Sequence, residues 1–301
     1  QDARDDFERA ISLLDELRGT SPRKAELRLD LCKAHLGLGN LLVRDRDNRD
    51  ILKAEHHIQI SFELADGLVT DFSKVTEYRR ERDNTLNSLA AVYYYDEKYA
   101  EAAKAWARVR QEAQRLFDEQ PEVPENQSQL GRALSNLGVA HNKLQSYEEA
   151  RKVLVEARDH LRAAATANSD NPDFKRYQRN ALRSLTEAYL GLGDHKAARQ
   201  STLEVVEIYP EVSSELYVQS RKMALCVAAL ASDDSLTDAQ RAELRTDYVL
   251  TAVQLLEKSS RRAVEDGSNK YRKSIIDAQP DFDSIRDEPM FRKLVDKFDV
   301  D

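Results

Sequence analysis

The 301-residue sequence has little glycine and proline, few cysteines and no long apolar segment. Its 9 glycines and 7 prolines leave little turn chemistry, whereas alanine, leucine, glutamate, arginine and lysine are abundant, a composition typical of helices. No apolar run approaches the ~18 to 20 residues that a membrane helix requires, and the first residues do not form a signal sequence. We therefore predict a soluble, all-α protein without a membrane partner, located in the cytoplasm.

Neither sign of charge is in strong excess. The sequence has 46 basic and 54 acidic residues, a net charge of −8, and the two signs are mixed along the chain. Binding to nucleic acid needs a basic stripe, so this distribution predicts that nucleic acid is not a partner.

A four-residue pattern with leucine at both ends recurs at a fixed interval. The four copies are Leu38-Gly39-Asn40-Leu41, Leu86-Asn87-Ser88-Leu89, Leu134-Ser135-Asn136-Leu137 and Leu182-Arg183-Ser184-Leu185. Their first leucines lie at 38, 86, 134 and 182, a step of 48 residues each time. An alanine stands thirteen residues after each second leucine, at Ala54, Ala102, Ala150 and Ala198. Two landmarks that repeat in phase predict a tandem array.

Each repeat is predicted to form two amphipathic helices that pack as an antiparallel hairpin. The leucines would face the partner helix, and the small alanine would let the two backbones approach closely. Four hairpins are predicted within 21–216, at about 23–70, 78–118, 127–167 and 174–210. Residues 217–301 are predicted to hold a divergent fifth hairpin and C-terminal capping helices. Residues 1–20 would be the second helix of a truncated preceding repeat, so we expect a larger parent protein.

The third copy continues from Leu137 to Gly138 and His141 and then reads Tyr147-Glu-Glu-Ala150, while the fourth carries Tyr189 and a closing Pro210. Over roughly 23–216 this pattern resembles the tetratricopeptide repeat, with a period of 48 in place of the usual ~34 residues. The resemblance implies a right-handed α-solenoid whose first helices line a concave groove for a protein or peptide.

The junction at 77–80 and the segment from Pro280 to Phe291 also resemble repeat regions that follow catalytic domains in large bacterial signalling proteins, including serine/threonine kinase-like ones. The sequence contains no kinase catalytic motif. We therefore predict a non-catalytic protein–protein interaction scaffold from such a protein, with any catalytic domain upstream.

The resemblance implies that the residue after each first leucine faces the groove, with a second set one turn further along. Tyr94 and Tyr95 belong to an aromatic cluster near Trp106 and could anchor a peptide. Basic side chains at Arg132, Lys143 and Arg183 could meet an acidic segment. The candidate binding residues are Asn87, Tyr94, Tyr95, Arg132, Lys143, Arg183 and Glu187.

Other candidate chemistry is better explained by packing. His56 and His57 are adjacent on a helix, so their side chains point about 100° apart and cannot easily share a metal ion. His141 and His195 occupy positions that hold tyrosine in other copies, which predicts packing roles. Cys32 and Cys226 lie four repeats apart, too far for a disulfide, and are predicted to be free buried thiols. No catalytic residue, cofactor or metal is expected.

Two further possibilities follow from the same array. A regulatory domain that senses a small ligand or peptide in its concave groove is the alternative function, and a deep closed pocket with convergent polar groups would favour it. An exposed end of the array could also join two copies as a homodimer.

Overall fold

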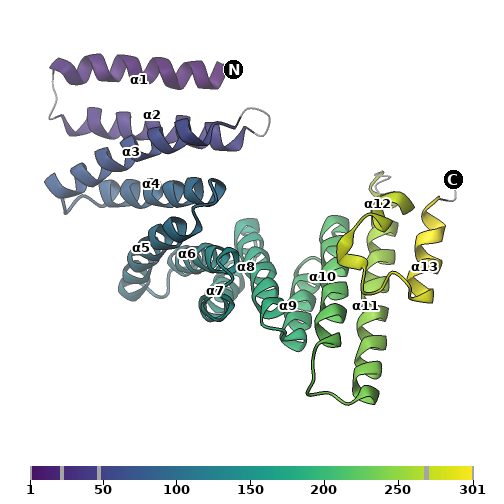
Figure 1. The fold of residues 1–301 in the computed structure, drawn as a ribbon. Coiled ribbons are helices and arrows are strands. Elements are labelled where there is room, and N and C mark those ends of the chain that lie inside the picture. Colours follow the sequence, from purple (N-terminus) through teal and green to yellow (C-terminus); the bar gives the residue numbers. More distant parts are fainter. Residues whose placement is uncertain (1, 21–23, 46–48, 268–270, 300–301) are drawn as a thin grey trace. The chain divides into compact units, whose positions relative to one another are not determined.

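The computed structural model describes residues 2–20, 24–45, 49–267 and 271–299, which form helices joined by short turns (Figure 1). The predicted all-α fold of successive helix hairpins is confirmed, and the described ranges contain no strand. The helices are α1 (Asp2–Thr20), α2 (Ala25–Arg44), α3 (Ile51–Asp71), α4 (Thr76–Tyr95), α5 (Tyr99–Glu119), α6 (Pro124–Lys143), α7 (Tyr147–Ala167), α8 (Pro172–Gly191), α9 (His195–Ile208), α10 (Ser213–Ala231), α11 (Asp238–Glu265), α12 (Lys273–Asp277) and α13 (Pro289–Val295), with 3₁₀ segments η1 (Pro280–Phe282) and η2 (Asp296–Asp299).

The chain forms two compact units, Gln1–Leu144 and Gln145–Asp301. In the first unit each helix from α1 to α6 packs against the next, and α2 also contacts α4. In the second unit α7 to α11 pack in the same successive way, and α8 also contacts α10. The additional contacts join first helices of neighbouring hairpins, as expected where helix pairs stack on one another.

The repeated leucines and alanines form the buried seams between helices. The first leucine of each copy is at most 4% exposed, and the four alanines are fully buried. Of the second leucines, Leu89, Leu137 and Leu185 are buried, whereas Leu41 is only half-buried. Each buried leucine contributes about 1.5 to 3 kcal/mol to stability. The 48-residue period is therefore the period of the core.

Helices α6 and α8 begin at a proline, a few residues before the starts that the sequence predicts. The predicted starts of α6 and α8 are 127 and 174, whereas the helices begin at Pro124 and Pro172. Proline fits the first helical position, since the N–H group it lacks would have no partner there. At Asn171 the side chain also caps α8 by accepting a hydrogen bond from the Asp173 N–H at 3.0 Å.

The turns between paired helices share an unusual backbone conformation. Glu97, Gln145 and Gly193 have φ of 59°, 57° and 74°, and their positions are again 48 residues apart. Next to the first and third of these residues, the N–H groups of Lys98 and Asp194 donate to carbonyls five residues earlier, at 2.8 and 2.9 Å. This bond pattern ends a helix with one left-handed residue. Only one of the three copies uses glycine.

The C-terminal segments complete the core of the second unit. The side chains of Ile276, Phe282 and Phe291 are at most 1% exposed and belong to the same apolar cluster as Met223 and Leu256, on α10 and α11. Helix α11 begins with a capping box, in which Thr237 and Gln240 exchange hydrogen bonds.

Candidate functional site

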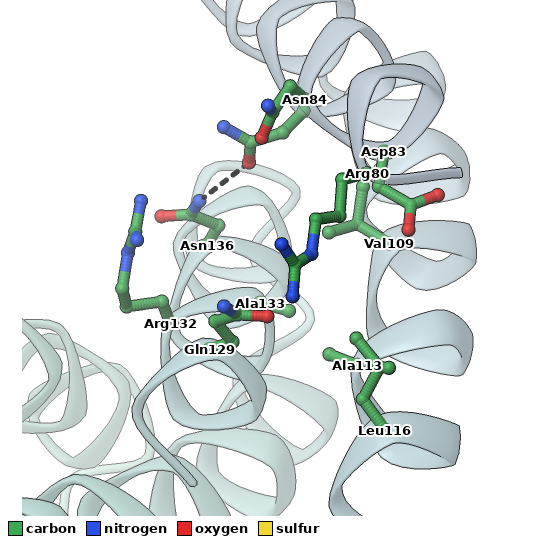
Figure 2. A pocket seen from close by; sticks show the side chains of 11 residues that line it. Arg80, Asp83, Asn84, Val109, Ala113, Leu116, Gln129, Arg132, Ala133 and Asn136 are labelled. Carbon is green, nitrogen blue, oxygen red and sulfur yellow. Dashed lines mark hydrogen bonds between the residues drawn. The ribbon is translucent and has the colours of Figure 1, made fainter. Parts of the chain in front are cut away.

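A cavity of about 220 Å³ lies among α4, α5 and α6 in the first unit (Figure 2). It is lined by Arg80, Asp83, Asn84, Asn87, Val109, Ala113, Leu116, Gln129, Arg132, Ala133 and Asn136. The residues from α4 and α6 recur at intervals of three and four, which places each set on one face of its helix. Figure 2 shows Arg80 directed into the cavity from α4, with Val109, Ala113 and Leu116 lining it from α5. This α4–α6 cavity thus has one apolar wall and two polar walls.

A network of side-chain hydrogen bonds fixes the orientation of the Asn87 amide. The Trp106 Nε1–H donates to Asn87 Oδ1 at 3.2 Å, and Asn136 Nδ2 donates to the same oxygen at 3.3 Å. Because indole nitrogen can only donate, the atom of Asn87 that faces Trp106 must be the oxygen. The Asn87 amide nitrogen therefore points away from Trp106 as a donor, and Asn136 keeps its own amide oxygen as an acceptor.

A second cavity, of about 430 Å³, adjoins the first at Asn87. Its lining residues are Asn40, Val43, Arg44, Arg49, Asn87, Ser88, Ala91 and Tyr95. The Arg49 guanidinium lies 4.8 Å from the centre of the Tyr95 ring, and its Nε donates to the Val43 carbonyl at 2.9 Å. We call this the α2–α4 cavity, and the two cavities together the Asn87 groove.

The Asn87 groove is positively charged although the chain carries a net charge of −8. Four arginines line it, Arg44, Arg49, Arg80 and Arg132, against one carboxylate, Asp83. Asp83 forms an ion pair with Arg82 at 3.2 Å, and burial raises the pKa of its carboxyl. The ion pair with Arg82 offsets the negative charge that Asp83 presents to the groove.

Arg80 and Arg44 differ from Arg82 in their partners. Arg82 pairs with Asp83 and, at 3.3 Å, with Glu112. Arg80 and Arg44 form no ion pair with any residue that the structure describes, and both side chains are exposed. Their guanidinium groups can therefore meet an incoming anion without first leaving a carboxylate.

The structure brings three of the candidate residues from the sequence to this groove. Asn87 lines both cavities, Arg132 lines the α4–α6 cavity and Tyr95 lines the α2–α4 cavity. Tyr94 instead packs toward α5, with its ring centre 5.9 Å from Trp106 and 5.5 Å from Tyr99. Lys143 is exposed in the last turn of α6 and lines neither cavity.

The two candidates in the second unit form ion pairs within that unit. Arg183 on α8 donates to Glu215 of α10 at 2.7 Å, and Glu215 is only 5% exposed. Glu187 accepts a hydrogen bond from Lys222, also on α10, at 3.1 Å. Both side chains therefore join first helices of adjacent hairpins, a contact that repeat periodicity alone did not indicate.

The expected position of Gly39 on the groove is corrected by the structure. A Cβ atom built at Gly39 would lie 2.4 Å from Ile58 and 3.2 Å from the Ala54 carbonyl oxygen. Gly39 therefore faces α3, and its lack of a side chain allows α2 and α3 to approach closely.

Several groove residues were missed from the sequence. Arg80 belongs to the junction segment 77–80, and Asn136 belongs to the third copy of the four-residue leucine pattern, but neither was predicted to bind. Arg44, Arg49 and Asn84 have no counterpart of the same type in every copy. The signal that could have identified the arginines is charge, because four arginines and one carboxylate line the groove.

His195 and the two cysteines are buried and serve packing. His195 is 2% exposed and is held by the Tyr248 hydroxyl at 2.9 Å and by Asp233 at 3.1 Å. Hydrogen bonds from Ser235, and then from His195, lower the pKa of Asp233 to about 2. Both cysteines are buried free thiols, as expected, and burial raises the pKa of Cys32 to about 11 and that of Cys226 to about 12. Such thiols are poor nucleophiles.

The described ranges offer neither a metal-binding cluster nor a membrane-spanning helix. They contain no cluster of three or more histidine, cysteine, aspartate or glutamate side chains arranged to hold a metal ion. Within the same ranges, no helix combines the length and the apolar character needed to cross a membrane.

Comparison with known proteins places part of this groove in a family. The tetratricopeptide repeat family model matches residues 84–122 and 130–160, which include most of the α4–α6 cavity. No curated protein matches the sequence. The crystal structure of BtubC (BKLC) from P. vanneervenii is similar with a TM-score of 0.58 and 13% identity, over 88% of this chain and 91% of that one. Residues 84–122 and 130–160 are thus similar to tetratricopeptide repeats, and the chain has the fold of a tetratricopeptide-type array of helix hairpins.

Proposed function

We propose that the protein is a non-catalytic interaction module that binds an extended peptide segment of a partner protein in the Asn87 groove. Tetratricopeptide repeats generally serve protein–protein interaction, and the matched residues include α5 and parts of α4 and α6 that line this groove. The observation that carries the proposal is the fixed orientation of the Asn87 and Asn136 amides.

A peptide unit carries one N–H donor and one carbonyl acceptor. Asn87 has an amide donor left over after its oxygen is saturated, and Asn136 has an amide oxygen left over after its nitrogen donates to Asn87. Together the two side chains offer a donor and an acceptor where the cavities meet. An extended backbone could therefore bind here without either amide having to rotate.

The cavities suit side chains of such a segment. Val109, Ala113 and Leu116 offer an apolar surface in the α4–α6 cavity, and Tyr95 stacked with Arg49 offers a flat surface in the α2–α4 cavity. The polar groups are distributed along helices instead of converging on one point. This distribution favours an extended ligand over the small-molecule sensor that is the alternative prediction.

The parent protein remains a prediction from the sequence. The resemblance of two segments of this sequence to repeat regions of large bacterial signalling proteins suggests that the module docks partners, or another part of the parent protein, beside a catalytic domain. Within the second unit, the divergent hairpin α10–α11 and the C-terminal segments would then cap the end of the array.

The proposal is tested with Asn87→Asp. This substitution keeps an oxygen that can accept from Trp106 and Asn136, but it replaces the amide donor by a carboxylate oxygen. Peptides selected from a displayed random library on the unaltered protein should bind Asn87→Asp at least about tenfold more weakly, the equivalent of one lost hydrogen bond to a charged or buried partner. Circular dichroism should show the same helix content.

The matched control is Gln111→Ala, on α5 but about 200° around the helix from Val109 and Ala113. It should leave binding unchanged. If Asn87→Asp binds the selected peptides as tightly as the unaltered protein, the Asn87 groove is not the binding site.

A further inference from the structure

The charge of the Asn87 groove is opposite to that of the chain around it. Four arginines and one aspartate line the two cavities, whereas the whole sequence has more acidic than basic residues. The aspartate is already paired with Arg82. The groove therefore carries an excess of positive charge on the face where the amides of Asn87 and Asn136 meet.

We infer that the segment bound in the Asn87 groove is acidic, with aspartate or glutamate side chains on both sides of the peptide unit held by Asn87. This inference rests on the proposed function, because it names the chemistry of the ligand at the same site. Arg80 and Arg132 would receive one carboxylate in the α4–α6 cavity, and Arg44 and Arg49 another in the α2–α4 cavity.

Guanidinium groups match carboxylates particularly well. Their N–H groups form a planar fork that can donate two parallel hydrogen bonds to the two carboxylate oxygens. Arg80 and Arg44, which have no ion pair among the described residues, need not give up a partner to do so. Arg49 is held in place by the Val43 carbonyl and the Tyr95 ring, so less side-chain freedom is lost on binding.

The surroundings favour a peptide over a nucleic acid. A nucleic-acid backbone presents regularly spaced charges and requires a long basic stripe, but the chain is acidic and the groove is interrupted by apolar and amide side chains. Amides that offer one donor and one acceptor fit a peptide unit, and the apolar wall from α5 fits the side chains between the carboxylates.

The corresponding face of the second unit does not offer the same charges. Glu215 accepts hydrogen bonds from Arg179 at 2.9 Å and from Arg183 at 2.7 Å, and Lys222 pairs with Glu187. These cations are neutralised by carboxylates of their own unit. The anion-binding positions are therefore the four arginines of the Asn87 groove in the first unit.

The test uses the full chain and two fluorescein-labelled decapeptide libraries, identical except that alternate positions hold glutamate in one and glutamine in the other. Fluorescence anisotropy should show at least about tenfold tighter binding of the glutamate library at low salt, and a smaller difference at about 0.5 M salt, where charges are screened. Arg80→Gln and Arg44→Gln should each weaken binding of the glutamate library about tenfold and leave the glutamine library unaffected.

Lys104→Gln is the matched control, because it removes one exposed cation from α5 on a face that does not line the groove. It should leave both libraries unaffected. Equal binding of the two libraries, or an equal effect of Lys104→Gln and Arg80→Gln, would overturn the inference. Tighter binding of a phosphoserine library or of single-stranded DNA would overturn it as well, by assigning the groove to phosphate.

The outcomes for ligand chemistry and for the site itself are separable. If the two libraries bind equally but Asn87→Asp still weakens selected peptides, only the acidic specificity is wrong. If Asn87→Asp has no effect on any selected peptide, the peptide-binding function fails with it.

Discussion

Replacement of Glu97 by glycine is expected to stabilise the first unit. Glu97 joins α4 to α5 with φ of 59°, in the left-handed region, and its side chain is exposed. A side chain in this region costs roughly 1–2 kcal/mol. The larger freedom of glycine in the unfolded chain offsets about 0.5–1 kcal/mol of that gain. The free energy of unfolding should therefore rise by about 0.5–1 kcal/mol in Glu97→Gly.

Glu97→Ala separates the backbone effect from the loss of charge, because it removes the carboxylate but keeps the Cβ atom. Glu97→Gly should be more stable than Glu97→Ala by about 1 kcal/mol. The reverse change, Gly193→Ala, should destabilise by about the same amount. A Cβ atom at Gly193 would meet no atom within 4 Å, so its cost comes from the backbone alone.

Urea unfolding followed by the fluorescence of Trp106 is a suitable assay for the Glu97 variants. Trp106 is the single tryptophan of the sequence and lies on α5, two turns after Glu97. Far-UV circular dichroism would follow Gly193→Ala in the second unit. If Glu97→Gly and Glu97→Ala unfold at the same urea concentration with the same slope, the turn is not strained and the reasoning is refuted.

Three further predictions concern stability. Burial, and then the charge of His57, lowers the pKa of His35 from 6.5 to about 4. Below pH 6.5 the unfolded chain binds a proton that the folded chain does not, so His35 should reduce the unfolding free energy by about 1.4 kcal/mol between pH 7.5 and 5.5. His35→Gln should remove this part of the pH dependence in urea titrations, and an unchanged pH profile would contradict it. Leu137→Ala should lower the free energy of unfolding by about 2–5 kcal/mol, because Leu137 is buried between helices. Leu52→Ala is the control, because Leu52 is 75% exposed, and it should cost under about 0.5 kcal/mol. Equal losses of stability in thermal unfolding would contradict the burial of Leu137. Arg183→Ala should lower the free energy of unfolding by about 1–3 kcal/mol, because it leaves the buried Glu215 with one hydrogen-bond donor fewer. Peptide binding should be unchanged. If Arg183→Ala instead weakens peptide binding without loss of stability, Arg183 belongs to the binding site.

The core was predictable because its determinants recur. The leucines of the four-residue pattern and the alanine that follows each copy are buried at equivalent positions, with the half-buried Leu41 as the exception. Because four copies repeat the same positions, one exception does not change the predicted core. The helix starts were less predictable. A proline such as Pro124 is compatible with a junction or with a first helical turn, and only the packing of the helix decides between them.

The turns show a different limit. Gly193 is a recognisable helix terminator, but Glu97 and Gln145 adopt the same left-handed conformation without glycine. Tertiary packing of the paired helices holds these residues in a conformation that their own preferences disfavour. The 48-residue period can therefore be recognised in the sequence of the core but not in that of the turns, although the turn conformation has the same period in the structure.

The candidate site was only partly predictable, and the reason lies in how the groove is built. Repeat positions indicate which face a residue occupies, and on that basis Asn87 was placed in the groove, whereas Arg132 was chosen for its positive charge. Whether a polar side chain on that face is available depends on its neighbour in the next hairpin. Arg183 has Glu215 opposite it, whereas Arg80 has no such carboxylate among the described residues.

Recognition in a repeat array must depend on the residues that break the repeat. Positions that recur in every copy are committed to packing, since stacking requires the same shape at each step. Asn87 occupies the repeat position that Gly39 holds in the preceding copy and Arg183 holds two copies later. Gly39 allows close packing of two helices, Asn87 presents an oriented amide, and Arg183 forms an ion pair. The same backbone position therefore serves three physical roles. A change at such a position alters what the surface can bind while the core that supports it stays the same.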